Sequence, residues 1–234
     1  MRVRRGRGWQ TVTVSIAAGA TLVLGLAACG SGASSTQSPN SSQTSSVATR
    51  QLTQPELDAA LLPASDFPPG LVPQPIVSQT SDFYSSMCPY FTQVGAPLPK
   101  LFSSRDYEDS AQGGTPTKVY ITAIEQYESP AQAKQAYDDL VKSYASCGTW
   151  TSPSDKAEVH VASVTGPTVG QASTYYKSGV AGTTQTFVGI SLNGTALVDS
   201  SVVDPAFGAT STEAPKPVVE LLQKQVPKYL AAAS

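Results

Sequence analysis

Alternating apolar and polar side chains predict the strands of this chain. Residues 119–127 alternate with a period of two and are rich in β-branched and aromatic side chains, which predicts a strand. Residues 158–163 repeat the pattern over a shorter length. Two further β-rich runs, 183–192 and 195–203, flank Asn193-Gly194. This dipeptide predicts a hairpin with a type I′ turn.

Apolar residues at helical spacing predict three helices. Thr53-Gln54-Pro55-Glu56 is a capping box and predicts a helix over 54–62. Ser129-Pro130 begins a second helix that ends at Gly148, and Pro217 begins a third over 217–230 that Pro227 would kink. This order of elements predicts the α+β class: one domain over 51–234, with an antiparallel β-sheet and the helices packed on one face.

The first 28 residues have the pattern of an export signal. Four arginines precede an apolar stretch over 12–26, and Leu26-Ala27-Ala28-Cys29 follows, which resembles a bacterial lipobox. The resemblance implies cleavage before Cys29 and acylation of its thiol, with a second acyl chain to stabilise the anchor. An ordinary signal peptide or a short uncleaved span are the alternatives. We therefore expect a bilayer anchor on the outer side of the cytoplasmic membrane.

Residues 29–50 are predicted to tether the domain to that anchor. The stretch 31–46 consists almost entirely of Ser, Thr, Gly, Gln and Asn, which cannot form a core. The whole chain has a net charge of −2, and removal of residues 1–28 takes away four arginines and no acid. The mature chain is therefore more acidic still, which argues against binding to nucleic acid.

Cys88 and Cys147 remain once Cys29 carries lipid. Disulfides persist outside the cytoplasm, so we expect these two cysteines to be bonded. A redox function is disfavoured, because there is no C-x-x-C motif and no Lys or His adjacent to either cysteine.

Several of these features occur in a characteristic order. Leu61-Leu62, Cys88, a strand leading into the Ser-Pro-Ala-Gln helix at 129, and Cys147 together resemble mycobacterial and related actinobacterial lipoproteins of the PknH-like sensor-domain family, over 55–230. That family is named for the extracytoplasmic domain of a serine/threonine kinase. The resemblance implies an antiparallel sheet with flanking helices around a cleft that binds an unidentified extracellular ligand. Members usually have a second cysteine pair, which residues 183–205 lack, so one disulfide is expected here.

Catalytic and metal-binding patterns are weak in this sequence. A serine hydrolase would have to use His160, the single histidine, and Ser191 lies in a predicted strand rather than at a nucleophile elbow. Asp106, Glu108 and Asp109 do not match a calcium loop, and we interpret them as a solvated loop. We expect no catalytic residue, no metal and no cofactor.

Tyrosine is the abundant aromatic residue, with ten Tyr against six Phe and two Trp. Its amphipathic ring suits ligand contact. Tyr175, Tyr176, Tyr120 and Trp150 are the candidate binding residues, and the pair Tyr175-Tyr176 is expected to be exposed in a stretch rich in Ser, Thr and Gly.

These observations favour a non-catalytic binding or sensor-type domain held at the membrane. Its partner would be a small-molecule, wall-derived or protein ligand that the sequence does not identify. A carrier of envelope lipid or glycolipid is the alternative and would need an apolar cavity. A hydrolase that uses His160 or a carboxylate pair is the third hypothesis.

Overall fold

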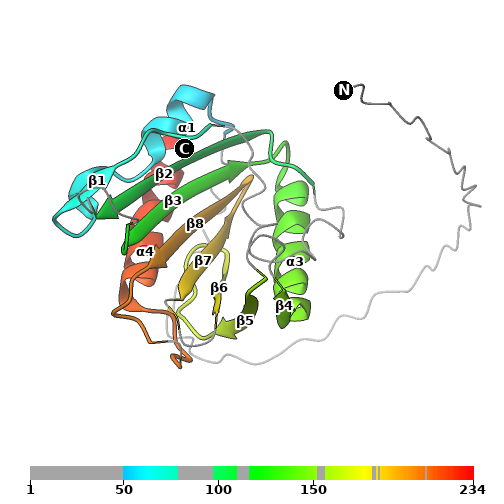
Figure 1. The fold of residues 1–234 in the computed structure, drawn as a ribbon. Helices are drawn as coiled ribbons and strands as arrows, with labels where there is room; N and C mark the ends of the chain where they lie inside the picture. The colour runs from blue at the N-terminus through cyan, green and yellow to red at the C-terminus, as the bar shows by residue number, and fades with distance from the viewer. Residues whose placement is uncertain are drawn as a thin grey trace, which may run out of the picture. The chain divides into compact units, whose positions relative to one another are not determined.

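The computed structural model describes residues 50–78, 97–109, 116–151, 156–180, 183, 185–208 and 210–234, all within one compact unit. Cys29, Cys88, the signal segment and most of the tether lie outside these residues. Eight strands form one sheet in the order β1-β2-β3-β8-β7-β6-β5-β4, and every neighbouring pair is antiparallel (Figure 1). The predicted α+β class and the antiparallel sheet are confirmed.

The sheet and helix bounds follow from the hydrogen bonding. The strands are β1 (Leu71–Pro73), β2 (Leu101–Asp109), β3 (Val119–Gln126), β4 (Thr149–Thr151), β5 (Glu158–Val164), β6 (Ala172–Val180), β7 (Thr186–Asn193) and β8 (Ala196–Val203). The helices are α1 (Gln54–Ala60), α3 (Pro130–Cys147) and α4 (Lys216–Ala232). All three predicted helices are present, although α1 ends two residues earlier than expected.

The helices cover both faces of the sheet, so the expectation that they pack on one face is wrong. α1 and α4 pack on one face, where α4 passes behind the strands in Figure 1, and α3 packs on the other. The reason lies in β7 and β8, in which consecutive residues such as Leu197 and Val198 are both apolar and belong to different cores. A sheet with two apolar faces must have both covered.

Two long strands escaped the sequence analysis. β2 includes Asp106, Glu108 and Asp109, which we had interpreted as a solvated loop, yet Tyr107 between them is fully buried. β6 crosses the stretch in which Tyr175-Tyr176 was expected to be exposed. In both strands pairing with two neighbours outweighs a local composition that favours loops.

The hairpin is present, but its turn is shifted by one residue. Asn193 pairs with Ala196, so the two central residues are Gly194 and Thr195. Gly194 has φ +58°, and Thr195 is not among the described residues with positive φ. Positive φ at the first central position alone is the pattern of a type II′ turn, so the expected type I′ turn is wrong.

Gln225 of α4 connects the helix to the segment that follows α1. Its side chain is fully buried. The Oε1 atom accepts hydrogen bonds from the Leu62 amide at 3.0 Å and from the Thr122 hydroxyl at 2.6 Å, and Nε2 donates to the Ala60 carbonyl at 2.6 Å. One side-chain amide of α4 thus satisfies buried polar groups of α1, of β3 and of the segment after α1.

The chain enters the domain beside the end of α4. The Arg50 amide donates to the Ala233 carbonyl at 2.8 Å, and its guanidinium donates to Ala232 and to Glu56. Glu56 also accepts from the Thr53 amide, as in the predicted capping box. These hydrogen bonds, first that from Arg50, lower the pKa of the Glu56 carboxyl to about 2.

Replacing Gln225 with Met should destabilise the domain by about 3 kcal/mol. The substitution keeps the volume but leaves the buried Leu62 amide, Ala60 carbonyl and Thr122 hydroxyl without their partner, at roughly 1–3 kcal/mol for each such group. Urea unfolding measures the change as a lower midpoint at constant slope. Gln223→Met, at an exposed position of α4, is the matched control and should change stability by less than about 0.5 kcal/mol. Equal midpoints for Gln225→Met and the wild type would contradict the prediction.

Candidate functional site

Tyr175 and Tyr176 are both buried, so the expectation that they form an exposed pair is wrong. Their exposed fractions are 3% and 2%, and they point to opposite faces of β6. The Tyr175 hydroxyl donates to the Pro167 carbonyl at 2.8 Å. The ring of Tyr176 stacks on Tyr144 of α3, with centroids 4.2 Å apart. Consecutive strand residues cannot line one site, because their side chains alternate between faces.

Gly189 is the sequence signal that could have revealed the buried position of Tyr175. These two residues face each other across β6 and β7. A Cβ atom at position 189 would lie 2.9 Å from the Tyr175 ring and 3.0 Å from Val218 of α4. A glycine in the middle of a strand commonly marks such a close approach.

The other two candidate aromatics are also divided between the faces. Tyr120 lies in the same core as Tyr175, and its hydroxyl donates to Asp204 Oδ2 at 3.2 Å. Trp150 is half-buried against the core beneath α3, and its Nε1 is buried without a hydrogen-bond partner among the described residues. The sheet therefore separates Tyr120 and Tyr175 from Tyr176 and Trp150.

Ser191 and His160 do not form a hydrolase pair. Ser191 is a fully buried residue of β7 whose hydroxyl donates to the Val169 carbonyl at 2.6 Å. His160 lies on β5, with the whole of β6 between the two strands. Its ring nitrogens are 3.1 Å from Thr149 Oγ1 and 3.1 Å from Glu158 Oε1, and its side chain is 45% exposed. The strand positions predicted for both residues are confirmed.

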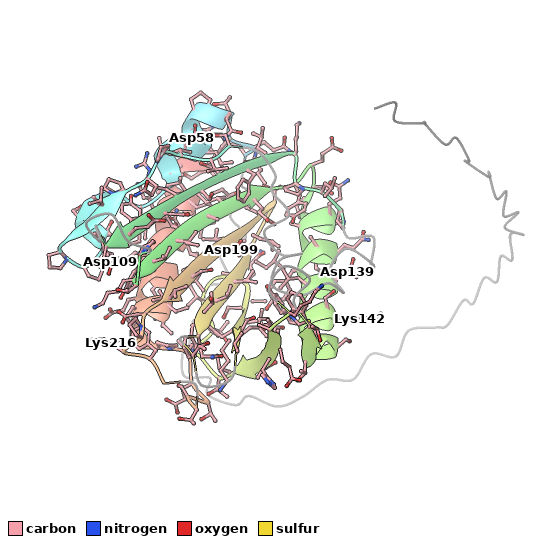
Figure 2. The ribbon with its side chains drawn as sticks, in the orientation of Figure 1. Asp58, Asp109, Asp139, Lys142, Asp199 and Lys216 are labelled. Carbon is pink, nitrogen blue, oxygen red and sulfur yellow. The ribbon has the colours of Figure 1, made fainter. Side chains whose placement is uncertain are left out.

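Carboxylates and tyrosines gather on the face of the sheet that α3 covers. Asp199 lies at the centre of the sheet on β8 (Figure 2), and Glu125 lies diagonally from it on β3. The Tyr127 hydroxyl donates to Glu125 at 2.6 Å. Burial, followed by the charges of Glu125 and Asp199, raises the pKa of Tyr127, so this phenol stays protonated. Both carboxylates are more than nine-tenths buried, and the cluster is a polar part of the core rather than an open binding surface.

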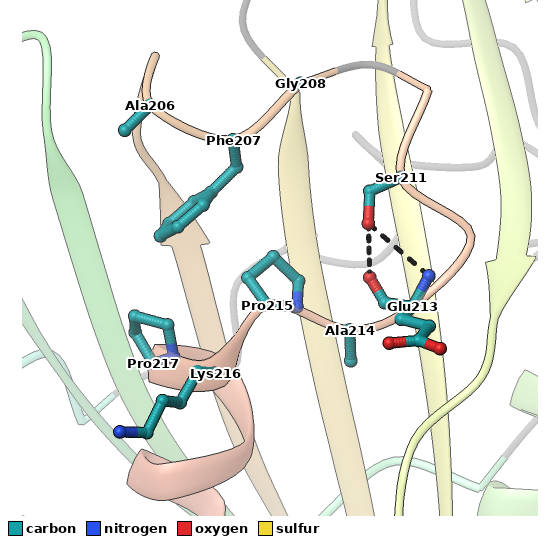
Figure 3. A pocket seen from close by; sticks show the side chains of 9 residues that line it. All are labelled: Ala206, Phe207, Gly208, Ser211, Glu213, Ala214, Pro215, Lys216 and Pro217. Carbon is teal, nitrogen blue, oxygen red and sulfur yellow. Dashed lines mark hydrogen bonds between the residues drawn. The ribbon is translucent and has the colours of Figure 1, made fainter.

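A surface pocket lies where β8 leads into α4 (Figure 3). Its volume is about 370 Å³, and it is lined by residues 206–208, 211 and 213–217. The Phe207 ring, two prolines and two alanines supply apolar surface, while Ser211, Glu213 and Lys216 supply polar groups. A pocket of this volume, lined by both polar and apolar groups, is large enough for a small ligand.

The walls of this pocket are held on both sides. Asp204 accepts from the amides of Ala206 and Phe207 at 2.9 and 3.0 Å. On the other side the Ala214 amide donates to the Thr165 carbonyl at 2.8 Å, and Lys177 Nζ donates to the Ser211 carbonyl at 2.8 Å. The pocket is thus formed before any ligand arrives. The sequence did not predict this pocket, although the prolines between the last strand and the last helix indicate an irregular segment.

Two further features bear on function. Within the described ranges no three His, Cys, Asp or Glu side chains gather in a way that could hold a metal ion. Nor does that part of the chain contain a helix long and apolar enough to cross a bilayer.

Comparison with solved structures identifies the fold. The extracellular domain of PknH from Mycobacterium tuberculosis matches with a TM-score of 0.57 at 12% sequence identity, over 77% of this chain and 98% of that domain. The chain has the fold of the PknH extracellular domain. A putative uncharacterized protein from Mycobacterium smegmatis matches with a TM-score of 0.40 at 11% identity, over 71% of this chain and 92% of that one.

No model of a known protein family matches the chain, and no curated protein matches it either. The resemblance to the PknH-like sensor domain that the sequence indicated is thus confirmed at the level of the fold.

The Tyr120 phenol should make stability fall with rising pH in alkaline solution. Burial, then the charge of Asp204 and their hydrogen bond, raises the pKa of Tyr120 to about 12, whereas a free tyrosine ionises near pH 10. Between these values the unfolded chain releases a proton that the folded domain retains, so the free energy of unfolding decreases as pH rises. Urea unfolding at pH values from about 9 to 12 measures this slope. Tyr120→Phe should make it shallower, and identical slopes would contradict the assignment.

Proposed function

We propose that this protein is a membrane-anchored extracytoplasmic lipoprotein with a non-catalytic domain that binds a ligand in the manner of a sensor. The observation that carries the proposal is the fold shared with almost the whole extracellular domain of PknH. The export pattern at residues 1–28 supports the same location independently of the fold.

Cys29 would carry the lipid, and residues 29–50 would lead from it to the domain. Support comes from the point of entry, where Arg50 is fixed to Ala232, Ala233 and Glu56. A tether of about 20 residues with this composition would span roughly 25 Å on average, so the domain could move away from the bilayer surface and also reach it.

A bond between Cys88 and Cys147 would fix the end of α3. Cys147 is in the last turn of this helix and is 3% exposed, whereas Cys88 lies outside the described residues. The bond would close a loop of about 60 residues, and closing such a loop stabilises a domain by about 2–4 kcal/mol.

The preformed pocket between β8 and α4 is the site that we assign to a soluble ligand. It opens at the first turn of α4, at the opposite end of this helix from the residues that hold Arg50. A helix of 17 residues is about 25 Å long, so the pocket would face away from the anchor. A small wall-derived molecule could reach it there.

Ligand binding at this pocket can be tested with soluble muropeptides as probes. We expect saturable shifts of the amide resonances of residues 206–208, 211, 213, 214 and 216, and Phe207→Ala should weaken binding about fivefold, because the ring supplies much of the apolar wall. Val72→Ala, at an exposed apolar residue outside the pocket, is the control and should bind as the wild type does. Mass spectrometry of the purified protein decides the alternative, since a lipid that copurifies with the unlipidated Cys29→Ser variant would favour a carrier. Absence of saturable shifts would contradict the ligand assignment.

The anchor is tested by replacing the acylated residue. Wild-type protein should partition into the detergent phase and carry the mass of its acyl chains at Cys29, because two chains hold a protein at a bilayer where one does not. Cys29→Ser should remove that mass and the detergent partitioning. Ser31→Ala, two residues away, should leave both unchanged. Equal partitioning of wild type and Cys29→Ser would show that Cys29 is not the anchor.

A further inference from the structure

Three basic residues gather between β2 and the second half of α4. Lys228 Nζ donates to the Leu61 carbonyl, and Lys224 Nζ lies 3.3 Å from Asp66 Oδ1 and 3.2 Å from its carbonyl oxygen. Arg105 of β2 points to the face of the sheet that α4 covers. Its pairing partner Thr122 points to this face too, since the Thr122 hydroxyl contacts Gln225, which precedes Lys228 by one helical turn. The cluster of Arg105, Lys224 and Lys228 therefore brings together three cations, of which Lys224 pairs with the carboxylate of Asp66.

Arg105 differs from the other described arginine. Arg50 forms a bidentate pair with Glu56, with hydrogen bonds of 2.9 and 3.1 Å. Within the described ranges Arg105 makes no ion pair and its side chain donates no hydrogen bond, and its Nε is buried without a partner. A buried donor without an acceptor is costly and rare in folded proteins.

The charges of this cluster interact. Burial lowers the pKa of the Lys228 amine, the carboxylate of Asp66 offsets part of this effect, and the positive charge of Arg105 lowers the pKa further. The positive charges of Arg105 and Lys228 repel each other, and the Arg105 guanidinium donates no hydrogen bond among the described residues. A bound anion would stabilise both charges.

We propose that Arg105 and Lys228 bind a phosphate group, with Lys224 at the edge of the site. The guanidinium fork matches two phosphate oxygens, and the ammonium adds a point charge. A carboxylate would occupy the fork alone, whereas phosphate carries enough charge and enough oxygens to engage both residues.

The position of the site suggests two sources of this phosphate. Lys228 precedes Ala233 by five residues, about 7.5 Å along a helix, and Ala233 holds Arg50 where the tether enters. If the chain is anchored as proposed above, an anionic phospholipid headgroup is within reach. Free phosphate is the other source, and the site itself does not depend on the anchor.

The first arm of the test uses inorganic phosphate and the full mature chain in a neutral detergent. At constant ionic strength, phosphate in place of chloride should raise the thermal midpoint in a saturable way. Arg105→Gln should weaken phosphate binding about tenfold, and Arg105→Lys should restore it only in part, because lysine lacks the fork. Lys142→Gln removes one positive charge at an exposed position of α3, on the other face of the sheet (Figure 2), and should bind as the wild type does.

The second arm places the lipidated chain in phosphatidylglycerol or phosphatidylcholine vesicles. Slower hydrogen exchange of residues 101–109 and 224–232 in phosphatidylglycerol alone, lost in Arg105→Gln, would identify the headgroup. An effect of free phosphate without this protection would identify a soluble source.

Asp66→Asn is the control for misfolding, because a misfolded variant loses phosphate binding whereas this variant should gain it. This variant removes the carboxylate that pairs with Lys224, so phosphate should bind about threefold more tightly. The proposal is overturned if neither arm depends on Arg105, or if Lys142→Gln weakens binding as much as Arg105→Gln does. Either outcome would leave the muropeptide test of the pocket unaffected.

Discussion

The buried amide of Gln225 is the contact on which the arrangement of this domain depends. It joins the last helix, a central strand and the segment that follows the first helix, which are far apart in the sequence. Two neighbours reinforce this contact: Lys228 donates to the Leu61 carbonyl and Tyr107 donates to the Leu62 carbonyl at 2.7 Å. Side chains of β2 and α4 therefore fix the Leu61-Leu62 segment through its backbone amide and carbonyl groups, which would otherwise be buried without hydrogen-bond partners.

Helices on both faces restrict where a ligand can bind. The centre of the sheet is occupied by α4 on one side and, over β5, β7 and β8, by α3 on the other. Even its polar residues, such as Asp199 and Ser191, are buried there. The two binding sites that we propose, the pocket at the start of α4 and the basic cluster near its end, accordingly lie at the ends of the layers.

Features that depend on local sequence could be predicted, and features that depend on distant partners could not. The Ser129 cap, the capping box at Thr53 and the final hairpin are each specified within a few residues, and all are present. β2 and β6 have polar, loop-like compositions and become strands only because both their edges are paired. For the same reason Tyr175 was assigned to the surface, whereas its burial depends on the space above Gly189. Nothing local indicates that the charges of Arg105 and Lys228, which are far apart in the sequence, would interact.

The pairing of β3 with β8 also has a kinetic consequence. These two strands are adjacent in the middle of the sheet, yet Val119 pairs with Val203 and most of the remaining strands lie between them in sequence. Contacts between such distant residues form slowly, because a long loop must close before they contribute. The Gln225 amide reaches back even further, to Ala60 and Leu62. If the chain is exported as proposed, it would therefore stay open until its last helix has crossed the membrane, and folding chaperones on the far side would have time to bind it.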